Sequence, residues 1–194
     1  MPVPVTMTLD FICPWCHIGH ANLLTALRRL PDGAAQVAYR PFELNPGAPP
    51  EGMDRTAYRS AKFGAERARM MDAHVTAAGA AVGVPFNLGA ITRTPATRRA
   101  HLLVQAVGAH GPAVVERILT AYFVEARDIS DPAILRDLAY AAGMEAEAVE
   151  AVLSAADAPL PPSPVQGVPL FEIGTLVLEG AQSPEALESA LCRA

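Results

Sequence analysis

The sequence predicts an α/β protein in which the two ends of the chain build one sheet and a large helical segment is inserted between them. The chain shows a β-α-β pattern over residues 1–42, helical periodicity over residues 54–154, and a β-β-α pattern after residue 169. Neither end has enough strands for a stable sheet alone, and pairing the two ends removes that shortage. We therefore expect a sheet-containing domain made of residues 1–45 and 160–194, and an inserted helical domain over residues 50–155.

The first elements follow from residue type and spacing. Residues 3–9 are rich in β-branched and apolar residues and predict a strand, with Pro4 near its beginning, where a proline is tolerated. Over residues 16–30 the apolar residues recur at helical spacing, and Pro31-Asp32-Gly33 ends this helix. Residues 36–40 predict a second strand, and the Pro- and Gly-rich residues 45–53 predict a linker.

The helical segment divides at Gly, Pro and Asp residues. The predicted helices cover residues 54–82, 96–109, 112–126, 131–142 and 145–154. Residues 155–167 contain four prolines and exclude a regular helix. The short apolar runs 170–173 and 176–178 predict a hairpin around Gly174-Thr175, and residues 183–191 predict a closing amphipathic helix.

Composition narrows the possible functions. Of the 194 residues, 51% are hydrophobic and 18% are charged, which suits a packed core and not a disordered chain. The net charge is -5 and no clustered basic face is visible, so we expect no nucleic-acid partner. No apolar run is long enough for a membrane span, and the N-terminus lacks the pattern of a secretory signal. We expect a cytoplasmic protein without a membrane partner, for which a homodimer is one option.

The chain has three cysteines, and two of them form a Cys-x-x-Cys pair. Cys13 and Cys16 stand where the first predicted strand meets the first predicted helix, and a two-residue spacer can bring their sulfurs within disulfide reach. A close cysteine pair in a reducing compartment indicates catalysis or metal binding more than a structural disulfide. Cys13 would lie beside unpaired backbone N–H groups at the positive end of the helix dipole, which favours the reactive thiolate. Pro14 suits the first helical position.

This arrangement predicts a two-step exchange reaction. Cys13 attacks a substrate disulfide, and Cys16 then attacks Cys13 to release the reduced substrate. In the reverse direction a Cys13–Cys16 disulfide oxidises a substrate dithiol, and the sequence leaves the direction open. No cofactor is needed beyond this redox-active pair, with glutathione as an optional co-substrate.

Each polar residue near the cysteine pair has a possible functional role and a possible structural role. Cys13, Cys16, His17 and His20 match a metal-binding spacing, but neighbouring residues on a helix project about 100° apart and converge poorly on one ion, so we expect no metal. His17 and His20 either tune Cys16 or are partly solvated helix residues. Asp10 either influences proton transfer at Cys16 or only ends the strand. Trp15 is expected to face the substrate, and Cys192 is assigned no role.

At this point the sequence resembles the DsbA family of thioredoxin-fold oxidoreductases, and most closely its cytoplasmic FrnE-like branch. The resemblance rests on segments in order along nearly the whole chain: Asp10-Phe11-Ile12-Cys13-Pro14-Trp15-Cys16-His17-Ile18-Gly19, Arg40-Pro41-Phe42-Glu43-Leu44-Asn45-Pro46, Arg99-Ala100-His101, Ala121-Tyr122-Phe123, Asp128-Ile129-Ser130-Asp131, Gly167-Val168-Pro169 and Gly180-Ala181-Gln182-Ser183. It implies a thioredoxin fold with a large inserted α-helical domain.

The resemblance also implies a cis-proline loop opposite the cysteine pair. Gly83-Val84-Pro85 and Gly167-Val168-Pro169 compete for that place, and only the second directly precedes the predicted hairpin and last helix. We therefore assign the cis peptide bond to Val168–Pro169, which would leave the Val168 backbone free to bind an extended substrate. The proline-rich residues 155–167 stand where the family has a helix and are expected to reshape the groove near Pro169.

Three functions remain open on this sequence. The first is a thiol–disulfide oxidoreductase or isomerase that acts on protein or peptide thiols and disulfides. The second is a glutathione-dependent isomerase or small-molecule tailoring enzyme, in which the inserted helices and the Pro169 loop would form a closed apolar pocket. The third is a metal-binding module, or a chaperone-like module with a surface around Trp15 and Phe171.

Overall fold

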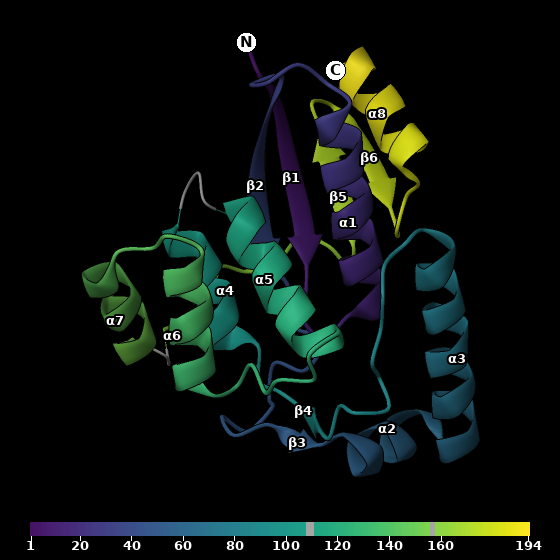
Figure 1. Ribbon diagram of the computed structural model, residues 1–194, viewed down its shortest axis with the longest axis vertical. Helices are drawn as coiled ribbons and strands as arrows, with labels where there is room; N and C mark the ends of the chain where they lie inside the picture. The colour runs from purple at the N-terminus through teal and green to yellow at the C-terminus, as the bar shows by residue number, and fades with distance from the viewer. Residues whose placement is uncertain (108–110, 156–157) are drawn as a thin grey trace.

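Both ends of the chain contribute strands to one sheet. The computed structural model describes residues 1–107, 111–155 and 158–194, and within these residues four strands form a sheet in the order β2-β1-β5-β6 (Figure 1). β1 (Val3–Leu9) pairs in parallel with β2 (Ala35–Pro41) and antiparallel with β5 (Leu170–Ile173). β5 pairs antiparallel with β6 (Leu176–Glu179). The pairing of β1 with β5 confirms the predicted union of the two chain ends.

Alternating side chains along β1 bury one face of the sheet. Val5, Met7 and Leu9 are buried and lie on one face, because side chains of a strand alternate between faces. Val5 lies opposite Ile173 and Met7 lies opposite Phe171, and both partners are fully buried. A one-residue slip would move this apolar set to the other face, so the burial pattern specifies the register.

Two helices belong to the same part of the molecule as the sheet. α1 (Pro14–Arg28) connects β1 to β2 as the crossover that a parallel strand pair requires. α8 (Pro184–Arg193) begins at Ser183, whose side chain accepts a hydrogen bond from the Ala186 N–H, and it lies beside α1 (Figure 1). The Asn22 amide of α1 donates over 2.8 Å to the carbonyl of Gln182, in the segment that leads into α8.

The inserted segment is helical, with one small additional strand pair. It contains β3 (Met53–Asp54), α2 (Arg55–Phe63), α3 (Ala65–Ala81), β4 (Arg93–Thr94), α4 (Arg98–Ala106), α5 (Gly111–Phe123), α6 (Pro132–Ala141) and α7 (Ala146–Ser154). α2, α3 and the β3–β4 pair lie at the end of the sheet where β1 finishes and α1 begins (Figure 1). The predicted α/β class with a helical insertion is therefore confirmed, while the exact domain bounds stay a prediction.

The single helix predicted over residues 54–82 is wrong. Gly64 separates α2 from α3 with a φ of 82°, a left-handed conformation that favours glycine and cannot continue a right-handed helix. The two-residue strands β3 and β4 were not predicted. The end of the predicted helix 96–109 at residues 108–109 lies outside the described residues, as do residues 156–157 of the proline-rich segment. Residues 158–167 contain no helix or strand, as predicted.

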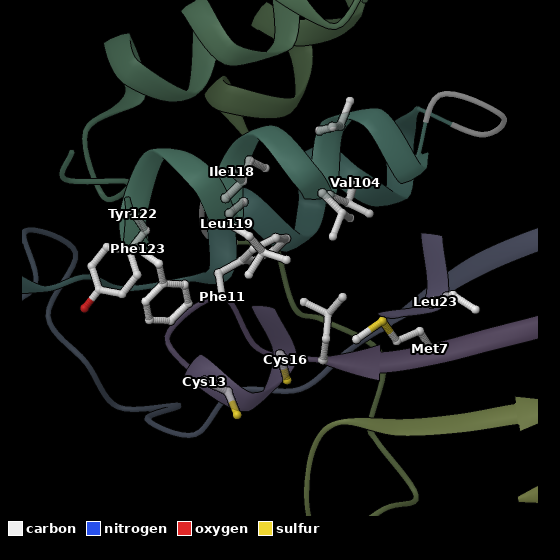
Figure 2. Close-up of a cluster of buried hydrophobic side chains, with 14 of the residues drawn as sticks. Met7, Phe11, Cys13, Cys16, Leu23, Val104, Ile118, Leu119, Tyr122 and Phe123 are labelled. Atoms are coloured by element: carbon white, nitrogen blue, oxygen red, sulfur yellow. The ribbon is translucent and has the colours of Figure 1, made fainter. Parts of the chain in front are cut away.

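One hydrophobic core runs through both parts of the molecule. Ile118, Leu119 and Phe123 of α5 gather beside Phe11 above the first turn of α1 (Figure 2). Cys16 is buried in this cluster. The position of the cysteine pair thus depends on residues from the insertion as well as on the sheet. No helix in the described part of the chain is both long and apolar enough to cross a membrane.

Candidate active site

Cys13 is the residue at which α1 begins. Its φ of -88° and ψ of 110° are extended, and Pro14 is the first helical residue, where its missing N–H leaves no donor unpaired. The Cys13 N–H donates to the Asp10 carbonyl over 3.1 Å, and the Cys16 N–H donates to the Cys13 carbonyl over 3.0 Å. The Cys13 side chain makes no capping hydrogen bond to the helix. Its sulfur therefore lies at the positive end of the α1 dipole, as the spacing predicted.

The two sulfurs of the pair have different environments. Both cysteines are free and both lie on the first turn of α1 (Figure 2). Cys13 retains 6% of its surface, whereas Cys16 retains none. Burial raises the pKa of the Cys16 thiol well above its ordinary value, and a hydrogen bond with Cys13 acts in the same direction. An external disulfide can therefore reach Cys13 but not Cys16.

The Val168–Pro169 loop faces Cys13. Its peptide bond is cis, the isomer that the family resemblance implied, and the Cys13 thiol donates to the Val168 carbonyl with an Sγ–O distance of 3.7 Å. Gly19 allows α1 to approach this loop, because a Cβ at residue 19 would lie 3.2 Å from Pro169 Cγ and 3.1 Å from Phe171 Cζ. A groove of about 650 Å³ is lined by this loop, by residues 164–170 together with residues 179–180, and Cys13 is not among its lining residues.

Asp10 is completely buried behind the cysteine pair. One carboxylate oxygen accepts a hydrogen bond from the Leu44 N–H over 2.7 Å, and the other lies 3.4 Å from His101 Nε2. Asp10 acts on the pKa of Cys16 in two opposing ways: a hydrogen bond with its backbone lowers this pKa, and its negative charge raises it by less. Asp10 therefore does more than end a strand.

His101 is a site residue that the sequence reasoning did not single out. It lies on α4 at the buried face shared with Ala100 and Leu103, and its ring is 4.9 Å from the Phe11 ring. A histidine on an otherwise apolar helix face was a signal for a buried polar partner. The partner itself, Asp10, lies 91 positions away in the sequence.

His17 and His20 are buried, so the expectation that they are partly solvated is wrong. The His17 ring stacks on Phe123 at 5.5 Å and meets Phe86 edge-on at 5.2 Å, and burial lowers its pKa to about 4. His20 Nε2 lies 2.8 Å from the Tyr39 hydroxyl, and burial lowers the pKa of His20 to about 3. Both imidazoles are directed to partners other than the cysteines. No three metal-binding side chains converge on one point within the described ranges.

Trp15 lies at the entrance of a cavity next to Cys13. Its side chain is exposed, and its ring is 5.6 Å from that of His74 on α3. The cavity has a volume of about 340 Å³ and lies between the first turn of α1 and the helices α2 and α3. Its lining includes Cys13, Trp15, Arg59, Lys62, Phe63 and Val75.

This cavity differs from the pocket predicted for an isomerase. The Pro169 loop was predicted to form part of the wall of that pocket. Pro169 is not among the residues that line it. Phe171 is fully buried in the core and cannot contribute to a chaperone-like surface beside Trp15, so that part of the third interpretation is wrong. Cys192 is exposed near the end of α8 and is not part of the site.

The parallel β1–β2 pair, the antiparallel β1–β5 pair, and a helix that begins at the first cysteine of the pair together define a thioredoxin-fold protein with a helical insertion. The chain belongs to the DSBA-like thioredoxin domain family, whose family model matches residues 5–159.

Similar proteins cover almost the whole chain. A probable DsbA oxidoreductase from Streptomyces coelicolor shares 26% identity with a TM-score of 0.81, over 98% of this chain and 89% of that structure. The cytosolic disulfide reductase DsbM from Pseudomonas aeruginosa, solved with glutathione, has a TM-score of 0.62 at 20% identity, over 98% of both chains, and shows similarity of fold. The uncharacterized protein YwbO of Bacillus subtilis is 24% identical over 98% of this chain and 96% of its own length.

Proposed function

We propose that this protein is a thiol–disulfide oxidoreductase with Cys13 as the nucleophile and Cys16 as the resolving thiol. The observation that carries this proposal is the asymmetry of the pair on the first turn of α1. Cys13 lies at the helix N-terminus with part of its surface accessible, and Cys16 lies fully buried one turn behind it. Thiolates are favoured at helix N-termini, and the accessible thiolate is the one that attacks.

The reaction proceeds through one mixed disulfide. The Cys13 thiolate attacks one sulfur of the substrate disulfide, the substrate S–S bond breaks, and the first substrate thiolate leaves. The Cys16 thiolate then attacks the Cys13 sulfur, so that a Cys13–Cys16 disulfide forms and the second substrate thiolate leaves. The protein dithiol loses two electrons and the substrate gains them. The same steps in reverse oxidise a substrate dithiol.

The loop beside Cys13 suits an extended peptide. The Val168 carbonyl already accepts a hydrogen bond from Cys13, and the Val168 N–H has no hydrogen-bond partner in the described residues. A peptide laid along Val168 could pair with this backbone in the manner of an added strand. We therefore propose protein or peptide thiols and disulfides as substrates, with no cofactor other than the cysteine pair.

Glutathione is the small thiol that we propose as co-substrate. The support is the Pseudomonas aeruginosa disulfide reductase of the same fold, whose structure was determined with glutathione. We also propose a cytoplasmic location and membership of the FrnE-like branch. An isomerase of this fold would not need a resolving thiol, so dependence on Cys16 separates the two functions.

The decisive experiment compares three cysteine variants in the reduction of insulin. Cys13→Ser should abolish activity because the nucleophile is lost, and Cys16→Ser should trap a mixed disulfide that mass spectrometry detects on Cys13. Cys192→Ser is the matched control and should keep full activity, because this exposed cysteine lies outside the site. Insulin reduction that survives Cys13→Ser would refute the proposal. Turnover of glutathione conjugates without Cys16 would favour the isomerase.

A further inference from the structure

The cavity next to Cys13 combines an apolar wall with an excess of positive charge. Phe63, Val75 and Leu88 contribute to its apolar lining, and Tyr58, Tyr122 and Phe123 add aromatic rings. A volume of about 340 Å³ falls in the range of small-molecule sites. The cavity opens beside the Cys13 side chain and is separate from the groove that contains Pro169.

Three cations and one carboxylate line this cavity. Arg55 and Arg59 both bind Asp72, each over 2.8 Å, so two guanidinium groups share one negative charge. Lys62, the single lysine of the chain, also lines the cavity. Its ammonium donates to the Tyr58 hydroxyl over 2.7 Å and to Asn45 over 3.0 Å, and no carboxylate of the described residues pairs with it. The whole chain carries a net charge of -5, so this local excess of cations opposes the overall charge.

Two of these cations lie against aromatic rings, Arg59 half-buried and Lys62 exposed at the rim of the cavity. Lys62 Nζ lies 5.2 Å from the centre of the Tyr58 ring, and Arg59 Cζ lies 5.5 Å from the centre of the Phe63 ring. Arg59 Nε is buried, with no hydrogen-bond partner in the part of the chain that the structure describes. Burial also lowers the pKa of Arg59 from its ordinary value. A ligand in the cavity would therefore meet Arg59 through its terminal amino groups, and a cation that is partly withdrawn from water binds an anion more strongly than one in open solvent.

We propose that this cavity binds the carboxylate-bearing aromatic part of a small-molecule disulfide whose sulfur reacts with Cys13. The inference rests on the proposed function and names a substrate class for it. The aromatic body would pack against Phe63 and Val75 while the carboxylate approaches Arg59 and Lys62. A small molecule fits better than a protein segment, because the peptide-binding backbone of Val168 is not part of this cavity.

The reaction with such a substrate passes through a mixed disulfide between Cys13 and one aryl thiol. The Cys13 thiolate attacks the sulfur attached to the aromatic ring in the cavity, the aryl S–S bond breaks, and the other aryl thiolate leaves. Cys16 then attacks Cys13 and forms the intramolecular disulfide, and the second aryl thiolate leaves the cavity. Two electrons pass from the protein dithiol to the aryl disulfide, and the two cysteine protons pass to solvent.

The test compares two aryl disulfides on the reduced protein by stopped-flow absorbance. Dithiobis-nitrobenzoate carries a carboxylate on each ring, and dithiodipyridine carries none. Each rate constant is divided by the rate constant of the same probe with free cysteine, which removes the difference in intrinsic reactivity. The Cys192→Ser background removes the exposed thiol that would otherwise react with both probes. We expect a normalised preference of about tenfold for the anionic probe, because a hydrogen bond to a charged group contributes at least about that factor.

Charge variants test whether the cavity causes this preference. Lys62→Gln should reduce the normalised ratio several-fold, and Asp72→Asn should raise it, because the two arginines then lose their shared counter-charge. Arg117→Gln removes the same charge on α5, does not line the cavity, and should keep the ratio. Circular dichroism of each variant confirms that it is folded.

The outcomes distinguish the two proposals. If neither probe reacts with Cys13, the proposed function fails. If both react at equal normalised rates, or if Lys62→Gln keeps the preference, only the cavity assignment is overturned. A peptide disulfide with an acidic side chain whose normalised rate constant exceeds that of dithiobis-nitrobenzoate would assign the cavity to a protein side chain and overturn the small-molecule substrate.

Discussion

Cys16 can act as the resolving thiol only after it loses a proton, and its surroundings make that loss difficult. Burial raises the pKa of its thiol, so few molecules carry the Cys16 thiolate at neutral pH. Asp10 is a buried carboxylate whose charge acts on this thiol. Its carboxylate accepts a hydrogen bond from the Leu44 N–H and lies 3.4 Å from His101 Nε2. These protein groups, and not water molecules, therefore fix its orientation. We infer that Asp10 assists the second step of the exchange and not the first.

The substitution Asp10→Asn tests this role. Asparagine keeps an oxygen that can accept the Leu44 hydrogen bond, but its amide cannot take up a proton. We expect release of the Cys13 mixed disulfide to slow at least tenfold, within the usual effect of a general base. Mass spectrometry of the Cys13 adduct, at set times after mixing with glutathione disulfide, measures this step.

A pH series separates proton transfer from a structural defect. In Asp10→Asn the release rate should rise steeply with pH, because hydroxide must replace the carboxylate as the proton acceptor. Attack by Cys13 should slow much less than release. An unchanged adduct lifetime, or equal slowing of both steps, would remove Asp10 from the proton pathway.

The elements built from local patterns were predicted well, and those that depend on distant contacts were not. The bounds of β1 and β5 follow from residue type and alternation and agree with the structure, and β6 is one residue longer than the run predicted for it. Glycine type alone did not reveal the break at Gly64, because Gly79 lies inside α3 without ending it. The difference lies in the backbone: Gly64 has a positive φ, which residue identity permits but does not require.

The site was only partly predictable for the same physical reason. The place of Cys13 at a helix start follows from a strand, a two-residue spacer and a helical pattern that are contiguous in sequence. The burial of His17 depends on Phe86 and Phe123, which belong to the insertion. The cavity beside Trp15 likewise forms only when α2 and α3 pack near α1. No local pattern contains these contacts.

The contact between α1 and the Val168–Pro169 loop depends on Gly19, so Gly19→Ala is an element-scale test. The added methyl would lie 3.2 Å from Pro169, closer than carbon atoms normally approach, and the loop must move by a few tenths of an ångström. We expect insulin reduction to fall several-fold. The melting temperature should change little, because alanine favours the helix by about 1 kcal/mol and offsets the crowding.

Gly33→Ala is the comparison variant, because it adds the same methyl group at a position where no atom lies within 4 Å of the new Cβ. The positive φ of Gly33 adds backbone strain to this variant. Its effect should appear in stability and not in the rate of insulin reduction. If Gly19→Ala reduced insulin at the normal rate, close packing of α1 on the loop would not matter for the reaction.

In the whole molecule the insertion and the sheet-containing part are joined around α1. Phe86 and Phe123 of the insertion enclose His17, and Tyr39 of β2 pairs with His20. Two histidines of one helix are therefore buried beside the core. The core itself continues from the sheet-containing part into the insertion (Figure 2). The integrity of this junction should depend on both imidazoles remaining uncharged.

Acid should therefore weaken the whole fold. The pKa of His17 falls from 6.5 to about 4 on folding, so between these values the unfolded chain binds a proton that the folded chain does not. The free energy of unfolding should decrease as pH falls below 6.5, by up to about 1.4 kcal/mol per pH unit for each buried histidine. His17→Phe keeps the aromatic packing, removes a buried nitrogen without a partner in the described residues, and should reduce that slope to about half, with His20 responsible for the rest. Urea unfolding at about pH 7, above this window, and at about pH 5, inside it, measures the slope. An equal slope in wild type and His17→Phe would show that His17 is not buried at the junction.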